Sequence, residues 1–336
     1  MNRGATAQMQ LCPVRPGDVL GDKFRVEQVL GQGGMGVVVA ATHLQLDERV
    51  ALKFLLPAAL ARPDVVARFA REARAAAKIK SEHIARVSDV GTLPDGAPYM
   101  VMEYLEGHDL GQLLRRDGAL PPTLALDYVL QACEALAEAH TLGIIHRDLK
   151  PANLFLTLER DGTQTIKVLD FGISKVADAP EAGLTTSEAM LGSPLYMSPE
   201  QMMSSSQVDP RSDIWSLGVT LYELMSRQNP FAGESLPEIC SRILQGEPTD
   251  LHALRPHLPV ELAAVIRRCL AKSPDQRFAT VGELALALQP FAPGCERSIQ
   301  RIQRRLAGGD PSASSVRSLG RSSHLPGSLP PASPSS

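Results

Sequence analysis

Aromatic residues, strong net charge and long apolar runs are all scarce in this sequence of 336 residues. Phe, Trp and Tyr make up 4% of the chain, so a core has to be built mainly from Leu, Val, Ala and Met. The formal net charge is −3, which argues against nucleic-acid or membrane binding through bulk electrostatics. No apolar run approaches the roughly 18 residues of a membrane-spanning helix. The N-terminal segment lacks the apolar stretch of a secretory signal, so we expect a cytoplasmic protein without a membrane span.

Cysteine is also sparse, and its placement argues against two kinds of site. The five cysteines are an odd number, lie far apart and form no CxxC pattern or Cys/His cluster. Neither a disulfide framework nor a cysteine-based zinc site is indicated, and we expect reduced, mostly buried thiols. They are Cys12, Cys133, Cys240, Cys269 and Cys295.

The most informative stretch present is a dense polar run at residues 146–153, with the sequence His-Arg-Asp-Leu-Lys-Pro-Ala-Asn. It places an acid (Asp148), a lysine (Lys150) and an amide (Asn153) close together in the chain. Because a scaffold has to hold such groups still, we interpret the run as a functional loop rather than ordinary surface.

Apolar residues flank this run on both sides, at 143–145 and 154–156, and we predict that both flanks are short buried strands. Another apolar run, 166–169, leads into Asp170-Phe171-Gly172.

A glycine-rich stretch at residues 31–36 follows a strand pattern at 24–30. A dinucleotide-binding fold would need a helix directly after the glycines and an acid about 20 residues on. The chain instead continues into a valine-rich run, 37–40, whose β propensity favours a strand–turn–strand hairpin. About 20 residues after the glycines it has a lysine, Lys53, and not an acid. Two interpretations of the hairpin remain. Its glycines could let the backbone approach the phosphates of a bound nucleotide closely, as only glycine allows, or they could form a tight turn that binds no ligand.

Helical patterns follow. Residues 65–78 are rich in Ala, Arg and Glu and contain Glu72, which by itself is typical of a surface carboxylate among arginines; the family resemblance given below implies instead that it pairs with Lys53. A strand is predicted at 99–105. Further helices are predicted at 124–139, 213–225, 260–270 and 281–288, and His140 is interpreted as a packing residue at a helix end.

The segments together resemble the eukaryotic-like protein kinases, in the polar loop, Asp-Phe-Gly, the glycine loop and the strand lysine. Lys150 two places after Asp148 resembles the Ser/Thr class. Gly33-Gly34-Met35-Gly36 and Ala152 resemble its bacterial branch. The resemblance implies an α+β, two-lobed protein kinase fold, with a small β-rich N-lobe carrying helix C and a larger helical C-lobe.

The domain boundaries that follow are a flexible N-terminus at 1–18 and a kinase domain at 19–291, with lobes of about 19–104 and 105–291. The Ser-, Pro- and Gly-rich tail at 292–336 is expected to be disordered. Within it, residues 295–307 could form a basic helix, which we interpret as a solvated extension of the last helix.

The resemblance also implies ATP as phosphoryl donor and Mg²⁺ as metal, for which Mn²⁺ could substitute. Asp148 would orient the substrate hydroxyl and accept its proton, while Lys150 would neutralise the transferring group. Asn153 and Asp170 would supply oxygens to the metal. The implied ATP-binding residues are Leu30, Gly31, Gln32, Gly33, Gly34, Met35, Gly36, Val37, Val38, Ala51, Lys53, Glu72, Met102, Glu103, Leu105, Asp109 and Phe155.

Residues 192–200 resemble the peptide-docking segment of the family, with Ser198 in place of the usual alanine and Ser193 in place of the usual threonine. Glu200 would pair with Arg277 and tie this segment to the lobe, and Asp213 is assigned a structural role. Such a segment favours a protein substrate carrying Ser or Thr.

Arg147, next to Asp148, implies control by phosphorylation of the activation loop. The candidate sites are Thr185, Thr186 and Ser187, and modification in trans would require self-association. Two alternatives stay open: a catalytically silent scaffold, disfavoured by the complete set of catalytic residues, and a small-molecule kinase, disfavoured by residues 192–200.

Overall fold

The structure is a computed structural model that describes residues 14–32, 36–93, 96–159, 161–171, 194–204 and 207–308. Several predictions concern other parts of the chain and lie outside the described residues. They are those on the N-terminal residues 1–13, on Gly33, Gly34, Met35, Gly172, Thr185, Thr186, Ser187 and Ser193, and on the tail from residue 309.

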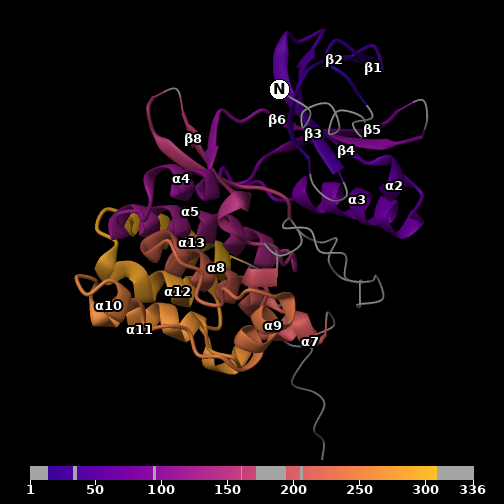
Figure 1. The fold of residues 1–336 in the computed structure, drawn as a ribbon. Coiled ribbons are helices and arrows are strands. Elements are labelled where there is room, and N and C mark those ends of the chain that lie inside the picture. The colour runs from indigo at the N-terminus through magenta and orange to yellow at the C-terminus, as the bar shows by residue number, and fades with distance from the viewer. Residues whose placement is uncertain are drawn as a thin grey trace, which may run out of the picture.

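The N-terminal lobe is a six-stranded antiparallel sheet in the order β1-β2-β3-β4-β6-β5 (Figure 1). Its strands are β1 (Val19–Leu20), β2 (Phe24–Gln32), β3 (Gly36–His43), β4 (Glu48–Leu55), β5 (Val87–Thr92) and β6 (Pro98–Glu103). Alternation along the central strands buries one face completely, because Val37, Val39, Leu52 and Phe54 are all 0% exposed. The predicted hairpin around the glycines is confirmed by the antiparallel pairing of β2 with β3.

Two helices, α2 (Pro57–Leu60) and α3 (Pro63–Ala76), accompany this sheet. Pro63 occupies the first turn of α3, where its missing N–H costs nothing, and Asp64 complements the helix dipole there. Val65, Phe69 and Ala73 form a small core with Met100 of the sheet. This packing fixes the rotation of α3 and places Glu72 on its buried side.

The C-terminal lobe is mostly helical, as the sequence predicted. Its helices are α4 (Leu110–Asp117), α5 (Pro122–Thr141), α7 (Pro199–Met203), α8 (Pro210–Ser226), α9 (Leu236–Gln245), α10 (Leu251–Leu254), α11 (Val260–Cys269), α12 (Val281–Leu288) and α13 (Glu296–Ala307). The short 3₁₀ turns are Pro151–Asn153, Pro194–Tyr196, Pro274–Gln276 and Gln289–Phe291. Buried α5 and α8 lie at the centre of one continuous core. Across the described residues, no helix is long and apolar enough to cross a membrane.

A small sheet of β7 (Gly107–Asp109), β8 (Leu154–Leu158) and β9 (Gln164–Val168) lies where the two lobes meet. The strand predicted at 154–156 is therefore confirmed, but the one predicted at 143–145 is wrong. Those residues follow the end of α5 in an irregular segment, with Gly143 at φ 71° and the Ile144 N–H bonded to the Ala139 carbonyl. Directly after this segment, the backbone N–H groups of His146 and Arg147 donate to the carboxylate of Asp213 in α8.

The end of the described chain contains the helix considered at 295–307, but that helix is packed rather than solvated as predicted. Residues 296–307 form α13, which packs against α5 and α12 (Figure 1). Ile299 is 3% and Ile302 0% exposed, so the helix is neither part of a disordered tail nor solvated on all sides. Three apolar residues among many arginines are enough to bury one face when two neighbouring helices offer a groove.

Candidate active site

The face of the N-lobe sheet opposite its core carries the predicted nucleotide-binding side chains. Directly paired residues in an antiparallel ladder point to the same side, and the register pairs Val38 with Lys53 and Ala51 with Met102. These four residues therefore share one face. Val37 lies on the other face, with its side chain 0% exposed in the core, so only its backbone could reach a ligand.

Lys53 of β4 binds two carboxylates from distant parts of the chain. Its Nζ lies 2.9 Å from Glu72 Oε1 in α3 and 2.7 Å from Asp170 Oδ1 in the loop after β9. Burial disfavours the charged ammonium, but the two carboxylates outweigh that cost and raise the pKa of Lys53. The same cation lowers the pKa of Asp170 against the effect of burial. Lys53 is consequently a fixed positive charge between the lobes.

The polar loop predicted at 146–153 forms a second cluster. Lys150 Nζ lies 3.0 Å from Asp148 Oδ2, and Asn153 Nδ2 donates to the Asp148 carbonyl at 2.7 Å. Because its amide nitrogen is used in this way, Asn153 has its amide oxygen left for a metal. The Asn153 carbonyl accepts the Leu169 N–H at 2.9 Å, which joins this cluster to the loop carrying Asp170.

The carboxylate of Asp213, in the buried helix α8, binds the backbone of the polar loop. Asp213 is 0% exposed, and its two oxygens accept the N–H groups of His146 and Arg147, each at 2.9 Å. His140 Nε2 lies 2.8 Å from the same carboxylate. His140, interpreted from the sequence as a packing residue at a helix end, therefore helps to orient Asp213. Arg147 has φ 68°, an unusual value for a residue other than glycine, which these bonds maintain.

His146 was not predicted as a site residue, yet it links the two loops. Its ring is 0% exposed, lies 4.8 Å from the Phe171 ring and has Nε2 2.9 Å from the Leu169 carbonyl. Burial lowers the pKa of His146, so the imidazole is neutral at neutral pH. The only sequence signal was its place at the head of the polar run.

The connection between the lobes is positioned by backbone and side-chain bonds of Glu103. Its N–H donates to the Arg86 carbonyl at 2.9 Å, and its carboxylate accepts the Arg86 N–H and pairs with Lys167 at 3.3 Å. Only its carbonyl is then available to an adenine edge. Asp109, predicted to bind the ribose, caps α4 through a 2.8 Å bond from the Gln112 N–H.

The other predicted nucleotide residues border the same region. Leu30 is a bulged residue of β2 and 45% exposed, and Phe155 of β8 lies opposite Asp109 and Lys167 in the small sheet. A side chain at Gly36 would come within 2.6 Å of the Phe54 carbonyl, so the start of β3 requires glycine. Gly31 and Gln32 end β2, and Leu105 follows β6.

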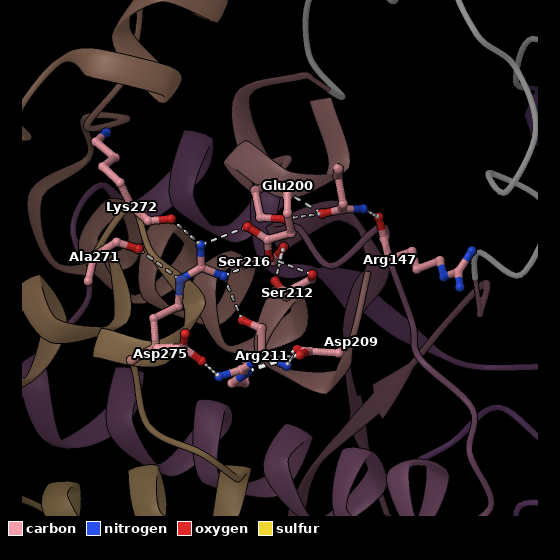
Figure 2. Close-up of polar contacts among 12 residues, drawn as sticks. Arg147, Glu200, Asp209, Arg211, Ser212, Ser216, Ala271, Lys272 and Asp275 are labelled. Atoms are coloured by element: carbon pink, nitrogen blue, oxygen red, sulfur yellow. Dashed lines mark hydrogen bonds and ion pairs between the residues drawn. The ribbon is translucent and has the colours of Figure 1, made fainter. Parts of the chain in front are cut away.

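The predicted ion pair between Glu200 and Arg277 is present and buried. Arg277 donates from Nη1 to Oε1 at 2.7 Å and from Nη2 to Oε2 at 2.8 Å, and Ser212 Oγ donates to Oε1 at 2.6 Å. Figure 2 shows Glu200, Ser212 and the backbone of Arg211 gathered around this guanidinium.

Gln201 was missed by the sequence analysis, although it ties the docking segment to the polar loop. Its Nε2 donates to the Arg147 carbonyl at 2.9 Å, and its Oε1 accepts the Ser198 N–H at 3.1 Å. Ser198, the departure from the family pattern, is 0% exposed at the start of α7, where a small polar residue fits.

Comparisons with known proteins agree with this geometry. Residues 24–287 match the family model described as protein kinase domain. The chain is 40% identical over 277 residues to the serine/threonine-protein kinase pkn3 of Myxococcus xanthus, covering 81% of this chain and 50% of that protein. It is 39% identical over 269 residues to PknB of Mycobacterium leprae (strain TN), covering 79% of this chain and 42% of that protein.

The solved structures that resemble this chain include the kinase domain of Mycobacterium tuberculosis PknI. That match has a TM-score of 0.65 and 32% sequence identity, and covers 83% of this chain and all (100%) of the solved chain. The chain thus spans half or less of the length of the curated relatives described above, but the whole of the solved domain.

Proposed function

This chain belongs to the protein kinase family, and from that premise we propose that it transfers the γ-phosphoryl group of ATP to Ser or Thr hydroxyls of proteins. The observation that carries the proposal is the placement of Lys53 within 2.7 Å of Asp170 and 2.9 Å of Glu72, which lie 117 and 19 positions away in the sequence. This arrangement supports the proposal, because phosphoryl transfer from a nucleoside triphosphate depends on positioning and charge neutralisation.

The residues fit Mg²⁺ as the metal. Asp170 offers a carboxylate and Asn153 an amide oxygen, and hard cations of this kind take oxygen ligands. When bound, Mg²⁺ would neutralise charge on the phosphates. Lys53, held by Glu72, would bind the phosphates from the sheet side and keep the nucleotide between the lobes.

Asp148 performs the proton transfer in this proposal. Its carboxylate accepts a hydrogen bond from the incoming hydroxyl, orients the oxygen and takes its proton as the new bond to the γ-phosphorus forms and the bond from that phosphorus to the bridging oxygen breaks, which releases ADP. Lys150, 3.0 Å from Asp148, places a positive charge beside the reacting groups. Asp213 holds the loop that carries both residues, so it is a positioning residue.

The test is transfer of labelled phosphate from ATP to a generic protein substrate. Asp148→Asn should lower the rate by about 10²–10⁴-fold, because general-base catalysis contributes that much, while ATP binding by calorimetry stays within about twofold. Asp117→Asn, which removes an exposed carboxylate at the end of α4, is the matched control. A wild-type protein that binds ATP but labels no protein would support a scaffold. Labelling of small acceptors alone would support a small-molecule kinase.

We further propose that phosphorylation of Thr185, Thr186 or Ser187 activates the domain, in trans between two copies. The support is Arg147, whose Nη1 is buried and has no hydrogen-bond partner among the described residues. Burial lowers the pKa of Arg147 although the charge of Asp213 raises it, so an added phosphate would further stabilise this cation. Because ATP is the phosphoryl donor, we place this activity in the cytoplasm.

Alanine at all three positions should remove the phosphate found by mass spectrometry and lower activity. Full activity of the unphosphorylated triple variant would refute this mode of control, although it would leave the kinase assignment intact.

A further inference from the structure

A further cluster of polar groups, two of them buried and one exposed, lies away from the nucleotide site, where the segment between α3 and β5 meets α5. It consists of Glu82 and His83 from that segment and Glu134 from α5, whose ligand atoms lie within 4.8 Å of one another. His83 is 5% and Glu134 1% exposed, and Glu82 lies at the solvent side. Nothing in the proposed phosphoryl transfer uses these residues.

The orientation of His83 determines which nitrogen carries its hydrogen. Nδ1 lies 3.0 Å from the Ile166 carbonyl, which can only accept a hydrogen bond, so Nδ1 is the protonated nitrogen. A neutral His83 then presents an electron pair at Nε2. Burial lowers the pKa of His83, which favours this neutral form at pH 7.

The atoms that face Nε2 are also electron-pair donors. Glu134 Oε1 lies 3.7 Å away and Glu82 Oε1 3.8 Å away. Within the described part of the chain, neither Nε2 nor Glu134 Oε1 has a hydrogen-bond partner. The 3.7 Å between Nε2 and Glu134 Oε1 is too long for a hydrogen bond, so a shared proton would not satisfy these two electron-pair donors. A larger cation placed between them would.

We propose that Glu82, His83 and Glu134 form a binding site for a divalent transition metal, with Zn²⁺ as the best match to one imidazole and two carboxylates. Metal bonds of 2.0–2.2 Å in a tetrahedral arrangement would separate the ligand atoms by roughly 3.4 Å, a few tenths of an ångström less than the 3.7 and 3.8 Å that separate His83 Nε2 from the two carboxylate oxygens. A ring N–H donated to a backbone carbonyl is the usual support of a metal-bound histidine, and His83 has it.

Arg301 of α13 is the competitor for this site. Its Nε lies 3.2 Å from Glu134 Oε2 and its Nη1 contacts Glu82 Oε1. Glu134 can keep that contact and bind a metal through Oε1, but Glu82 has to release Arg301 and turn inward. Glu82 and Arg301 are 60% and 45% exposed, so both side chains have room to move.

The site would join the segment that follows α3 to the central helix α5. Since α3 carries Glu72, a bound metal would restrain the element that holds Lys53. The metal is therefore structural in this proposal, and binding should raise the melting temperature even without ATP.

The test is calorimetric titration of the chelator-treated full chain with Zn²⁺, in an Asp170→Asn background that weakens metal binding at the nucleotide site. We expect one Zn²⁺ per chain, at least tenfold weaker binding for His83→Gln and for Glu134→Gln, and no change for His257→Gln, an exposed histidine. Arg301→Gln should tighten binding, because it removes the competing cation without touching a ligand. Co²⁺ should give the visible absorption of a four-coordinate site that His83→Gln abolishes.

Three results would overturn the proposal. They are the absence of stoichiometric Zn²⁺ binding, equal affinity of the His83 and His257 variants, and weaker binding after Arg301→Gln. Circular dichroism of each variant without metal identifies any that fail to fold, and the Arg301 variant then decides the question.

Discussion

Removing the charge of Glu200 should destabilise the C-terminal lobe strongly, because its partner Arg277 is buried. The guanidinium is 0% exposed, and every one of its five N–H donors has an acceptor. Two go to Glu200, and the others go to backbone carbonyls at 2.8–3.1 Å, those of Ala271, Arg211 and Lys272. In Glu200→Gln the carbonyls remain, but the opposite charge is lost.

Breaking a buried ion pair on one side costs about 3–5 kcal/mol, since the other charge is left without compensation. At about 2–4 °C per kcal/mol for a domain of this size, the melting temperature should fall by roughly 6–20 °C. Burial alone would raise the pKa of Glu200, but hydrogen bonds and charge from Arg277 lower it. The stabilisation is thus present above pH 4.5 and lost as pH falls through the lowered pKa, so the variants should converge in acid.

The fluorescence of Trp215 during urea unfolding is a direct assay. It is the single tryptophan of the chain, is 0% exposed and stacks on Phe231 at 5.1 Å. The guanidinium of Arg277 lies 5.1 Å from its ring, so the reporter adjoins the perturbed group.

The matched control is Glu238→Gln, which breaks an exposed i,i+4 pair with Arg242 and should cost less than about 1 kcal/mol. A Glu200→Gln protein within about 1 kcal/mol of wild type would refute the reasoning. So would a double variant with Arg277→Met that is less stable than Glu200→Gln, since removing both charges should recover part of the loss.

Three further predictions concern other parts of the structure. Asp213→Asn should lower kcat by roughly 10²-fold or more with little change in KM for ATP, because the polar loop loses its anchor; an unchanged kcat in steady-state assays would contradict this. Ile302→Ala, at a fully buried position of α13, should cost about 2–5 kcal/mol in urea unfolding, whereas Leu286→Ala, 48% exposed, should cost far less. The lowered pKa of His146 means that its contribution to stability is complete above pH 6.5 and is lost as pH falls below it; His146→Asn should flatten the stability profile between pH 5 and 7.

Much of the arrangement of the candidate site could be predicted from the sequence, because the residues that we propose for phosphoryl transfer are chemically distinctive and occur in fixed local patterns. Asp148, Lys150 and Asn153 lie within one loop, and the alternation of β4 defines the face on which Lys53 lies. The pair of Glu200 and Arg277 required the family resemblance, since 77 positions separate its members.

Other predictions depended on contacts that local patterns do not contain. The apolar residues 143–145 suggested a strand, but Asp213, 67 positions beyond His146, binds the backbone that follows them and keeps it irregular. Val37 belongs to the valine run after the glycines, and only the register with Phe54 shows that its side chain faces the core.

The sequence by itself determined most of the strands and helices, the family, and the set of acids, lysine and amide that we propose for the reaction. The elements follow from short-range periodicity and the family from its motifs, neither of which folding alters. Only the tertiary structure decided that α13 packs on α5, and that His83 and Glu134 face each other with unpartnered atoms. Packing depends on which apolar faces and buried charges meet across the chain, and that choice is made by the whole core at once.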